Sequence, residues 1–324
     1  MMRKEYDVVT LGELLIDFTE YGTSAQGNPL WEANPGGAPC NVLAMLRRLG
    51  KQTAFIGKVG RDVYGDQLRA ALVETGIDTT GLLTDEKVHT TLAIVHKKPD
   101  GDRDFSFYRE PGADMNIRYE EVPEGLIENA RIFHFGTLSM THATNRDATV
   151  RAVARARECG ALISFDPNLR RPLWADESEM RAQMAWGLGQ CDILKISDDE
   201  IFFFTGEKDF AAASKKLTKQ FPNIRLLTVT AGPDGSYCSY GGFFEYVPAF
   251  LMKNTVETTG AGDTYGACVL NYILEHGICG LEAKDLREMM TFAGAAAAIV
   301  TTRKGALRVM PTREEVNALI AERK

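Results

Sequence analysis

Residues 257–266, "ETTGAGDTYG", place three glycines and one aspartate at the expected start of a helix. Gly260 and Gly262 permit backbone turns that a Cβ would block. The amides of Gly260, Ala261 and Gly262 would lie at the positive helix end, which favours an anion. Asp263, ionised at neutral pH, could accept a proton from an alcohol beside that anion. Phosphoryl transfer from ATP to a hydroxyl needs this combination; alternatively, Asp263 only complements the helix dipole.

Two better-known glycine motifs do not account for this stretch. A Walker A loop requires GxxxxGK[ST], which the sequence lacks. A dinucleotide-binding turn requires a following strand with an acidic residue about 20 positions later. We expect helices there, near 262–276 and 284–301, so a dehydrogenase is a weak alternative.

The elements that must position these residues follow an alternating pattern. Helix-like segments near 41–49, 64–75, 144–159, 177–188 and 210–220 alternate with apolar strand-like runs at 6–12, 53–57, 131–136, 161–167, 192–197 and 225–230. This alternation predicts βαβ units and a three-layer α/β/α sandwich with a mostly parallel central sheet. A hairpin is expected at 235–247. No repeat or linker divides the chain, so we expect a single domain over residues 1–324.

Two stretches do not fit a doubly wound core. Residues 15–34 are polar and punctuated by Gly, Pro and Asn, and residues 88–108 alternate around "KPDGD" like a β-hairpin. A small β-sheet lid built from segments near 15–34 and 88–110 is one interpretation. Edge strands and a loop of the main sheet are the other.

Composition and charge limit the class of protein. Apolar residues make up 44% of the 324, which is typical of a globular protein, and the formal charge of −7 argues against nucleic acid as a partner. The N-terminal apolar run is short and interrupted by acids, so it indicates a first strand and no signal peptide or membrane span. Six scattered cysteines without a CxxC pair indicate the reducing cytoplasm, and the histidines lack zinc-ligand spacings.

A second glycine pattern lies about two hundred residues before the first. In "PGGAPCNVLAMLRRLGKQTAFIGKVG" (35–60), Gly36 and Gly37 are followed by Asn41, Gly50 and Gly60. Together, the two patterns resemble the paired signatures of the ribokinase-like (PfkB-type) carbohydrate kinases. The likeness runs from "LGELLIDF" (11–18) to "TTRKGALRVMPT" (301–312), and phrases such as "FYREPGADMNI" (107–117) and "FDPNLRRPLW" (165–174) are most similar to fructokinases. The family fold, a mostly parallel sheet between helices with a small β-lid, agrees with the pattern above.

The resemblance implies a set of sugar-binding residues. Asp17 would accept hydrogen bonds from a sugar diol, and Gly36 and Gly37 would let the backbone approach the sugar closely. Asn41 would bind a further hydroxyl. Residues brought toward the sugar or the transferred phosphoryl group would be Arg109, Asn168 and Arg170. Structural alternatives are a turn role for Asp17 and a helix-cap role for Asn41.

The resemblance also implies a nucleotide side with ATP and Mg²⁺. Lys195 would lie near the phosphates, and Glu200 would order Mg²⁺ through water, although Ser197 stands where the family usually has Asn. A nucleotide loop would include Thr230, Gly232 and Gly235, and residues 295–302 would wall the adenine. Glu257 replaces an Asp that helps bind a monovalent cation in relatives, so the candidate K⁺ site is expected to be altered or absent.

The resemblance therefore implies an ATP-dependent kinase that phosphorylates the 6-hydroxyl of D-fructose. Asp263 would be the base and the amides of residues 260–262 the anion hole. Alternatives are the same chemistry on 2-keto-3-deoxygluconate, ribose, a nucleoside or another ketose, and a fructokinase-like binding or regulatory protein without turnover. The lid would let two copies of the chain form a homodimer.

Overall fold

A computed structural model describes residues 4–97 and 103–323 of the chain. Its large sheet is built from the apolar runs that the sequence marks as strands, together with two hairpin strands and one further edge strand. Its nine strands are β1 (Tyr6–Leu11), β4 (Thr53–Gly60), β5 (Asp78–Asp85), β8 (Ala130–Gly136), β9 (Leu162–Asp166), β10 (Ile193–Ser197), β11 (Leu226–Thr230), β12 (Ser236–Tyr240) and β13 (Phe243–Val247).

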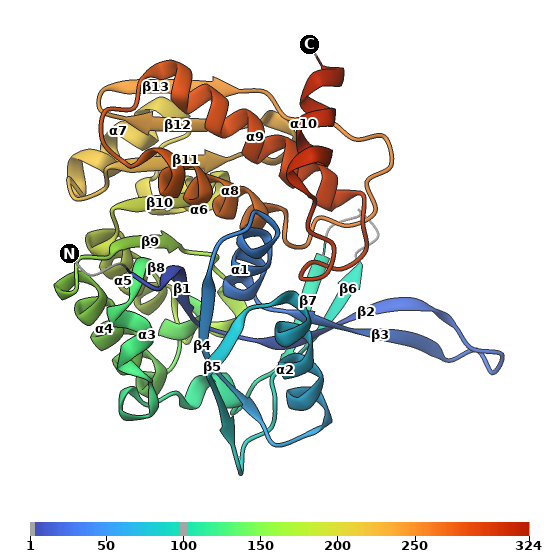
Figure 1. Cartoon of the computed structure of the whole chain (residues 1–324). Coiled ribbons are helices and arrows are strands. Elements are labelled where there is room, and N and C mark those ends of the chain that lie inside the picture. The colour runs from blue at the N-terminus through green and yellow to red at the C-terminus, as the bar shows by residue number, and fades with distance from the viewer. Residues whose placement is uncertain (1–3, 98–102, 324) are drawn as a thin grey trace.

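The strand order in this sheet is β13-β12-β11-β10-β9-β8-β1-β4-β5 (Figure 1). Every pairing from β11 to β5 is parallel, and β12 and β13 add an antiparallel hairpin at one edge. The prediction of a mostly parallel sheet is therefore confirmed. Because parallel strands end at one edge of a sheet, the residues after β9, β10 and β11 come together there.

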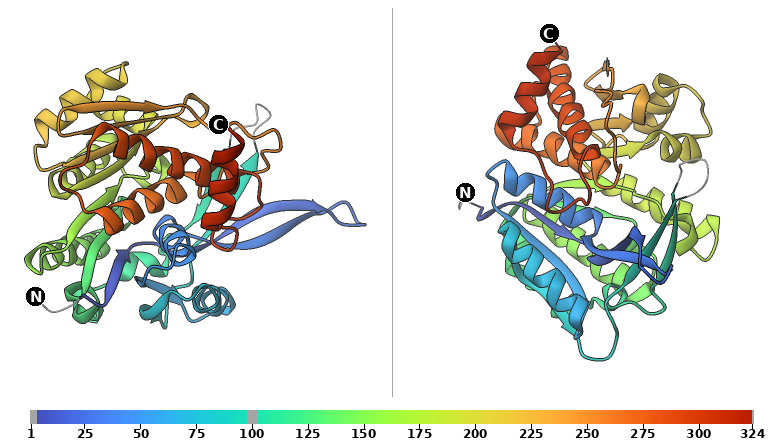
Figure 2. Two further views of the ribbon diagram at one scale, coloured as in Figure 1. Left: turned by 45° about the horizontal axis from the view of Figure 1, so that its top comes forward. Right: turned by 90° about the vertical axis from the view of Figure 1, so that its right-hand side faces the viewer.

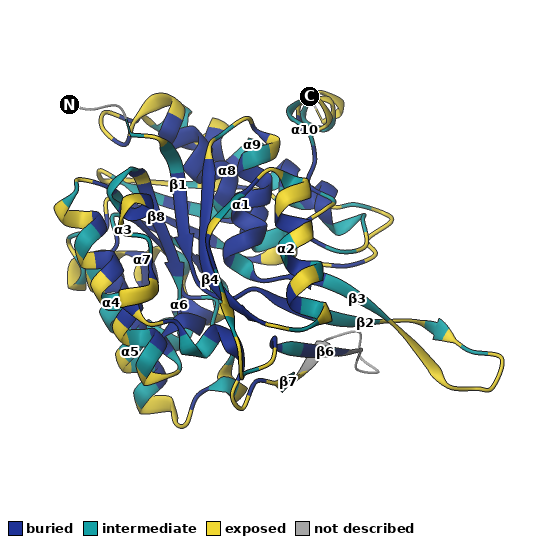
Figure 3. Ribbon diagram, turned by 60° about the horizontal axis from the view of Figure 1, so that its bottom comes forward, coloured by how far each residue is buried: buried dark blue, intermediate teal, exposed yellow. Residues whose placement is uncertain are grey.

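Helices cover both faces of the large sheet, as the two views of Figure 2 show. Apolar side chains of one set pack on the first face of the sheet, and those of a second set pack on the other face. The first set is α1 (Ala38–Arg48), α2 (Val63–Thr75), α8 (Ala261–His276), α9 (Ala283–Thr301) and α10 (Arg313–Glu322); the second is α3 (Glu124–Glu128), α4 (Ala143–Glu158), α5 (Glu177–Gln190), α6 (Asp198–Thr205) and α7 (Phe210–Gln220). Figure 3 shows the central strands buried between these layers, so the three-layer sandwich is confirmed.

The two stretches that did not fit the core form a separate sheet. Residues 15–36 make an antiparallel pair, and residues 92–108 supply two more strands in the order β3-β2-β6-β7. These strands are β2 (Leu15–Thr23), β3 (Pro29–Gly36), β6 (Leu92–Lys97) and β7 (Arg103–Tyr108). The β2–β3 hairpin projects away from the sandwich (Figure 1). The structure thus favours a small second sheet over edge strands of the main one; the turn expected at 98–102 lies outside the described residues.

Candidate active site

The glycine-rich stretch 257–266 leads into α8 and includes its first turn, as its residue types predict. Gly260 is the residue before the helix and has φ 78°, a left-handed conformation that glycine adopts without strain. A Cβ at Gly260 would also come within 2.8 Å of the Ala306 side chain. In this turn the Ala261 amide donates to the Thr258 carbonyl over 3.3 Å, so one of the three amides predicted to hold an anion has a partner in the chain.

Asp263 lies in the first turn of α8 and is only 9% exposed. Its carboxylate accepts a hydrogen bond from the Asn41 amide, with Nδ2 and Oδ2 2.8 Å apart. Asn41 belongs to α1, which begins directly after the Gly36–Gly37 pair. Asn41 and Asp263, one from each glycine pattern, are 222 residues apart in the sequence. The two patterns therefore meet at one buried hydrogen bond.

The pKa of Asp263 is raised to about 6. Burial is the largest cause, and the nearby Asp166 carboxylate raises it further. The hydrogen bond from Asn41 and the charges of Lys195 and Arg170 act in the opposite direction. Asp263 is therefore mostly ionised at neutral pH, yet it is basic enough to accept a proton from an alcohol.

Asp17 of β2, a predicted sugar residue, lies against Gly36. An added Cβ on Gly36 would come within 2.1 Å of Asp17 Oδ2, so the carboxylate would have to leave this position. Gly37 has φ 122° and its own close contact, since a Cβ there would lie 2.5 Å from the Glu13 carbonyl. The predicted sugar residues of the first pattern are thus neighbours in space.

A lysine and an aspartate extend the site across the ends of the parallel strands. Lys195 Nζ lies 2.9 Å from Asp166 Oδ2, and a Cβ on Gly262 would be 2.9 Å from the same ammonium. Burial lowers the pKa of Lys195, but the carboxylates of Asp166, Glu200 and Asp263 more than offset this, so its pKa is raised and it stays charged. The positive charge therefore lies directly over the start of α8.

Asp166 is a site residue that sequence reasoning missed. It ends β9 and is 4% exposed, and its Oδ1 has no hydrogen-bond partner among residues 4–97 and 103–323. A buried carboxylate oxygen without a partner is costly unless a cation or water satisfies it. The signal in the sequence was an acid at the end of an apolar strand, in "LISFDP", where ligands of parallel sheets bind.

Glu200 lies at the start of α6 with both carboxylate oxygens engaged. Oε1 accepts from the Leu169 amide at 2.7 Å and Oε2 accepts from the Ser197 amide at 2.9 Å. Ser197 in turn accepts from the Glu200 amide, which completes a capping box. Serine at position 197 therefore has a local structural reason.

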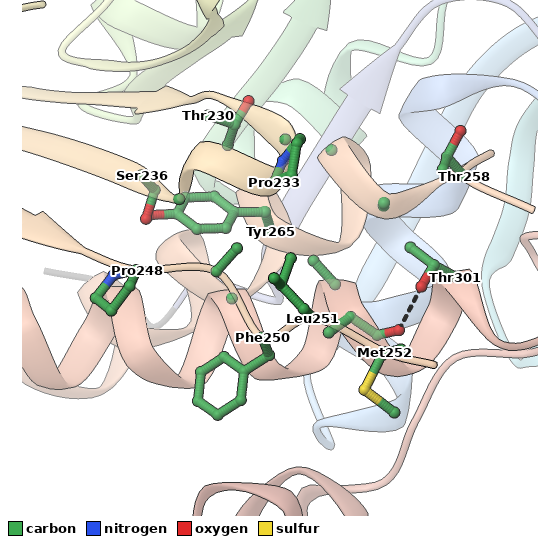
Figure 4. Close-up of a pocket in the computed structure, with 18 of the residues that line it drawn as sticks. Thr230, Pro233, Ser236, Pro248, Phe250, Leu251, Met252, Thr258, Tyr265 and Thr301 are labelled. Carbon is green, nitrogen blue, oxygen red and sulfur yellow. Dashed lines mark hydrogen bonds between the residues drawn. The ribbon is translucent and has the colours of Figure 1, made fainter. Parts of the chain in front are cut away.

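A cavity of about 390 Å³ opens beside the first turn of α8 (Figure 4). Thr230, at the end of β11, lines it together with Gly232 and Gly235 of the following turn. Gly232 and Gly235 both have positive φ, and a Cβ on Gly235 would lie 2.4 Å from the Val247 carbonyl. Apolar residues of 247–252 and the small residues of α9 form the other walls, which suits a flat heterocycle with phosphates at the helix end.

A second cavity, of about 450 Å³, is lined by Lys195 together with Asn168 and Arg170. Asn168 has the positive φ of 46°. The Arg170 guanidinium is close enough to Asp263 to lower the pKa of that carboxyl. The structure therefore brings Arg170 to the same site as Asp263.

Arg109 is held differently from Arg170. It is 4% exposed and forms an ion pair of 2.7 Å with Asp114. Its Nε also donates to Asp114 at 2.8 Å, Nη1 donates to the Thr141 hydroxyl at 2.8 Å, and Nη2 donates to the Leu138 carbonyl at 3.1 Å. All three nitrogens of the Arg109 guanidinium thus have protein partners, whereas we expected this side chain to reach toward the sugar or the transferred phosphoryl group.

Glu257 is 8% exposed and accepts a hydrogen bond from the Gly305 amide at 3.1 Å. Ala306, the next residue in that loop, packs on Gly260. The carboxylate therefore joins the 302–311 loop to the start of α8.

Within residues 4–97 and 103–323, no cluster of three or more His, Cys, Asp or Glu suited to a metal is present, and we find no helix with the length and apolarity to cross a membrane.

Comparison with known proteins gives one consistent result. The model of the pfkB family carbohydrate kinases matches residues 6–313. The chain is 41% identical over 315 residues to fructokinase-1 of Zea mays, covering 97% of each chain. Among solved structures, it is similar to a Xylella fastidiosa fructokinase with bound ATP (TM-score 0.88, 30% identity, 98% and 99% covered). It is also similar to a Vibrio cholerae fructokinase double mutant with fructose, ADP and potassium bound (TM-score 0.87, 26% identity, 99% and 100% covered).

Proposed function

Because this chain belongs to the pfkB family of carbohydrate kinases, we propose that it transfers the γ-phosphoryl group of ATP to the 6-hydroxyl of D-fructose. The observation that carries the proposal is the 2.8 Å hydrogen bond from Asn41 to Asp263. It places the candidate base of one glycine pattern beside the candidate sugar residues of the other. The fructokinases of Zea mays and Vibrio cholerae, similar over almost the whole chain, support fructose as the acceptor.

Each side chain has a role in this proposal. Asp17, the Gly36–Gly37 backbone and Asn41 orient the sugar, and Asp263 accepts the proton of the attacking hydroxyl. Lys195, beside Gly262, holds positive charge where the transferred phosphoryl group gathers negative charge. The amides of residues 260–262 act at the same point; the Ala261 amide would exchange its long contact with Thr258 for the phosphate.

The remaining candidate residues divide between the two substrates. ATP occupies the cavity of about 390 Å³, with its phosphates toward Gly232, Gly235 and Thr230. Asn168 and Arg170 face the phosphoryl group from the other cavity. Arg109 acts indirectly, because its guanidinium is held by Asp114 and by Thr141.

The residues present fit a magnesium ion bound with ATP. Asp166 Oδ1 is a buried carboxylate oxygen without a hydrogen-bond partner in the part of the chain that the structure describes, and the Glu200 carboxylate, like Asp166, lies near Lys195. Oxygen ligands of this kind are what Mg²⁺ prefers, usually with several waters. These two carboxylates would hold the ion or its waters, and the bound ion would neutralise charge on the nucleotide phosphates.

A monovalent cation is proposed beside Glu257. Its carboxylate lies next to the loop that packs on Gly260, so a cation there would act on the start of α8. Potassium is present in the Vibrio cholerae structure. The extra methylene of Glu257 relative to the usual Asp leads us to propose a weakened response to potassium.

We also propose that the chain is one kinase domain with the small sheet as its lid, and that two copies pair through that sheet as a homodimer. Large apolar side chains on the β2–β3 hairpin support the pairing: Tyr21 is 68% exposed, Leu30 44% and Trp31 37%. A monomeric mass by light scattering at micromolar concentration would contradict it. The cytoplasm is the proposed location, because the six cysteines are free thiols.

The test of the proposed activity is ADP release measured across a panel of acceptors. Fructose, ribose, 2-keto-3-deoxygluconate, other ketoses and nucleosides are compared by kcat/KM, each with and without potassium, and the product is identified as the 6-phosphate by NMR. We expect fructose to give the highest kcat/KM and Asp263→Asn to lower this turnover by about 10²–10⁴. A higher kcat/KM on another acceptor would overturn the choice of sugar, and no turnover on any acceptor would favour a binding or regulatory protein.

A further inference from the structure

The Glu13 carboxylate takes no part in the proposed chemistry, yet it is buried beside the sugar-binding turn. It lies between β1 and β2 and is 4% exposed. Its Oε1 accepts a hydrogen bond from the amide of Ala38 at 2.9 Å. Ala38 is the first residue of α1, so an acid from another element meets the amino end of this helix.

Helix α1 has no side chain of its own that accepts a hydrogen bond from the amides at its amino end. Its N-cap residue is Gly37, which has no side chain to accept a hydrogen bond, and its first turn contains no acidic residue. Pro39 follows and has no amide hydrogen. Glu13 therefore supplies from outside both the acceptor and the negative charge that a helix usually receives from its cap.

The backbone of Glu13 restrains the same turn from a second direction. Gly37, with φ 122°, packs so closely that a Cβ would lie 2.5 Å from the Glu13 carbonyl oxygen. One turn further along α1, Asn41 donates to Asp263. A shift of the first turn of α1 would therefore move both the sugar-facing glycines and the amide that holds the candidate base.

We propose that Glu13 is a positioning residue whose carboxylate fixes the start of α1 and, through it, the Gly36–Gly37 backbone and the Asn41 side chain. This inference rests on the proposed sugar kinase activity. It assigns no contact between Glu13 and either substrate.

The charged and titratable neighbours of Glu13 make the inference testable by pH. Burial raises the pKa of Glu13 to about 7, the Ala38 amide lowers it, and Asp114 and Arg109 act on it in opposite directions. Cys40 of α1 also faces it and, as a buried thiol with a raised pKa, stays neutral. Glu13 is therefore charged above about pH 7 and neutral below it. Sugar binding should weaken as the pH falls through this value.

The experiment measures KM for fructose, or for whichever sugar the panel prefers, from pH 5.5 to 9 in the wild type and Glu13→Gln. The wild-type KM should rise about threefold to tenfold below pH 7, because the charge at the helix end is lost. Glu13→Gln keeps an acceptor for the Ala38 amide but cannot titrate. Its KM for the sugar should therefore equal the raised, low-pH value of the wild type at every pH. Its KM for ATP should be unchanged.

A matched control separates positioning from stability. Asp209 caps α7 by accepting from the Ala212 amide at 2.8 Å, so Asp209→Ala removes a helix cap that is not part of the site. We expect Asp209→Ala to keep the wild-type KM profile. A Glu13→Gln enzyme that titrates like the wild type, or an Asp209→Ala enzyme with the same KM change, would overturn the inference.

A second measurement needs no turnover and so separates this inference from the proposed activity. Amide hydrogen exchange of residues 36–41 is followed in the unliganded wild type, Glu13→Gln and Asp209→Ala. Faster exchange at 36–41 in Glu13→Gln alone would support the positioning role. Unchanged exchange there would refute it, whether or not fructose is the acceptor.

Discussion

Replacement of Asn41 by alanine should move the pH at which the enzyme loses its base. The Asn41 amide donates to Asp263 Oδ2 at 2.8 Å and holds the pKa of that carboxyl down against burial and Asp166. A hydrogen bond to a charged group contributes about 1.5–3 kcal/mol, which corresponds to about 1–2 pKa units. From its value of about 6, the pKa of Asp263 should therefore rise to between about 7 and 8 in Asn41→Ala.

The consequence for turnover follows from the ionised fraction of Asp263. With a pKa of about 6, roughly 90% of the wild-type carboxyl is ionised at pH 7, against about 10–50% in Asn41→Ala. Turnover at pH 7 should fall about twofold to tenfold and should recover near pH 9. Because protonation removes the base, activity is lost as the pH falls through the pKa, so the acidic limb of the profile moves upward.

The assay is kcat as a function of pH at saturating sugar and ATP, which removes any weakening of sugar binding by the same substitution. Asn271→Ala is the matched control, because Asn271 is a buried asparagine further along α8. Its acidic limb should stay at the wild-type position. An Asn41→Ala enzyme whose acidic limb also stays at the wild-type position would refute the assignment of this limb to Asp263.

Three further predictions concern the same site. Asp263→Asn should lower kcat by about 10²–10⁴ because its amide cannot accept the proton, while calorimetry should give wild-type ATP affinity; full turnover in this variant would remove Asp263 from the mechanism. Gly262→Ala should displace the Lys195 ammonium, since its Cβ would lie 2.9 Å from Nζ, and we expect a several-fold loss of kcat/KM for ATP; unaltered kinetics would contradict the position given to Lys195. Glu257→Asp should increase the ratio of rates in potassium and tetramethylammonium chloride, and an identical ratio in both enzymes would count against a cation at this carboxylate.

The alternation of apolar runs and helical segments was enough to predict the sandwich, because buried parallel strands carry continuous apolar sequence. It was not enough for β5, Asp78–Asp85, which is an edge strand with the half-exposed sequence "DTTGLLTD". Nor did periodicity decide where residues 15–34 and 88–108 belong. Strands of similar polarity occur at sheet edges and in small separate sheets, and the choice depends on pairings between β2 and β6 across more than seventy residues.

The candidate site divides in the same way. The sequence was enough to predict four glycines of the site, because a Cβ at these positions would come too close to neighbouring groups. They are Gly36, Gly37, Gly260 and Gly262. Asp166 was missed because an acid after a strand carries no distinctive spacing. We assigned Arg109 to the sugar or the transferred phosphoryl group, but no sequence pattern indicated the buried partner, Asp114, that holds it. Such pairings depend on packing of elements distant in the chain.

The hydrogen bond between Asn41 and Asp263 also has a consequence for protein synthesis. The ribosome makes the proposed sugar-binding turn first and must add another 222 residues before it reaches Asp263, the proposed base. Up to that point the nascent chain contains neither Asp263 nor the start of α8, so it lacks the groups proposed to move a phosphoryl group. Incomplete chains should therefore consume no ATP at this site, and the proposed reaction would begin only when the last part of the sandwich folds onto the first.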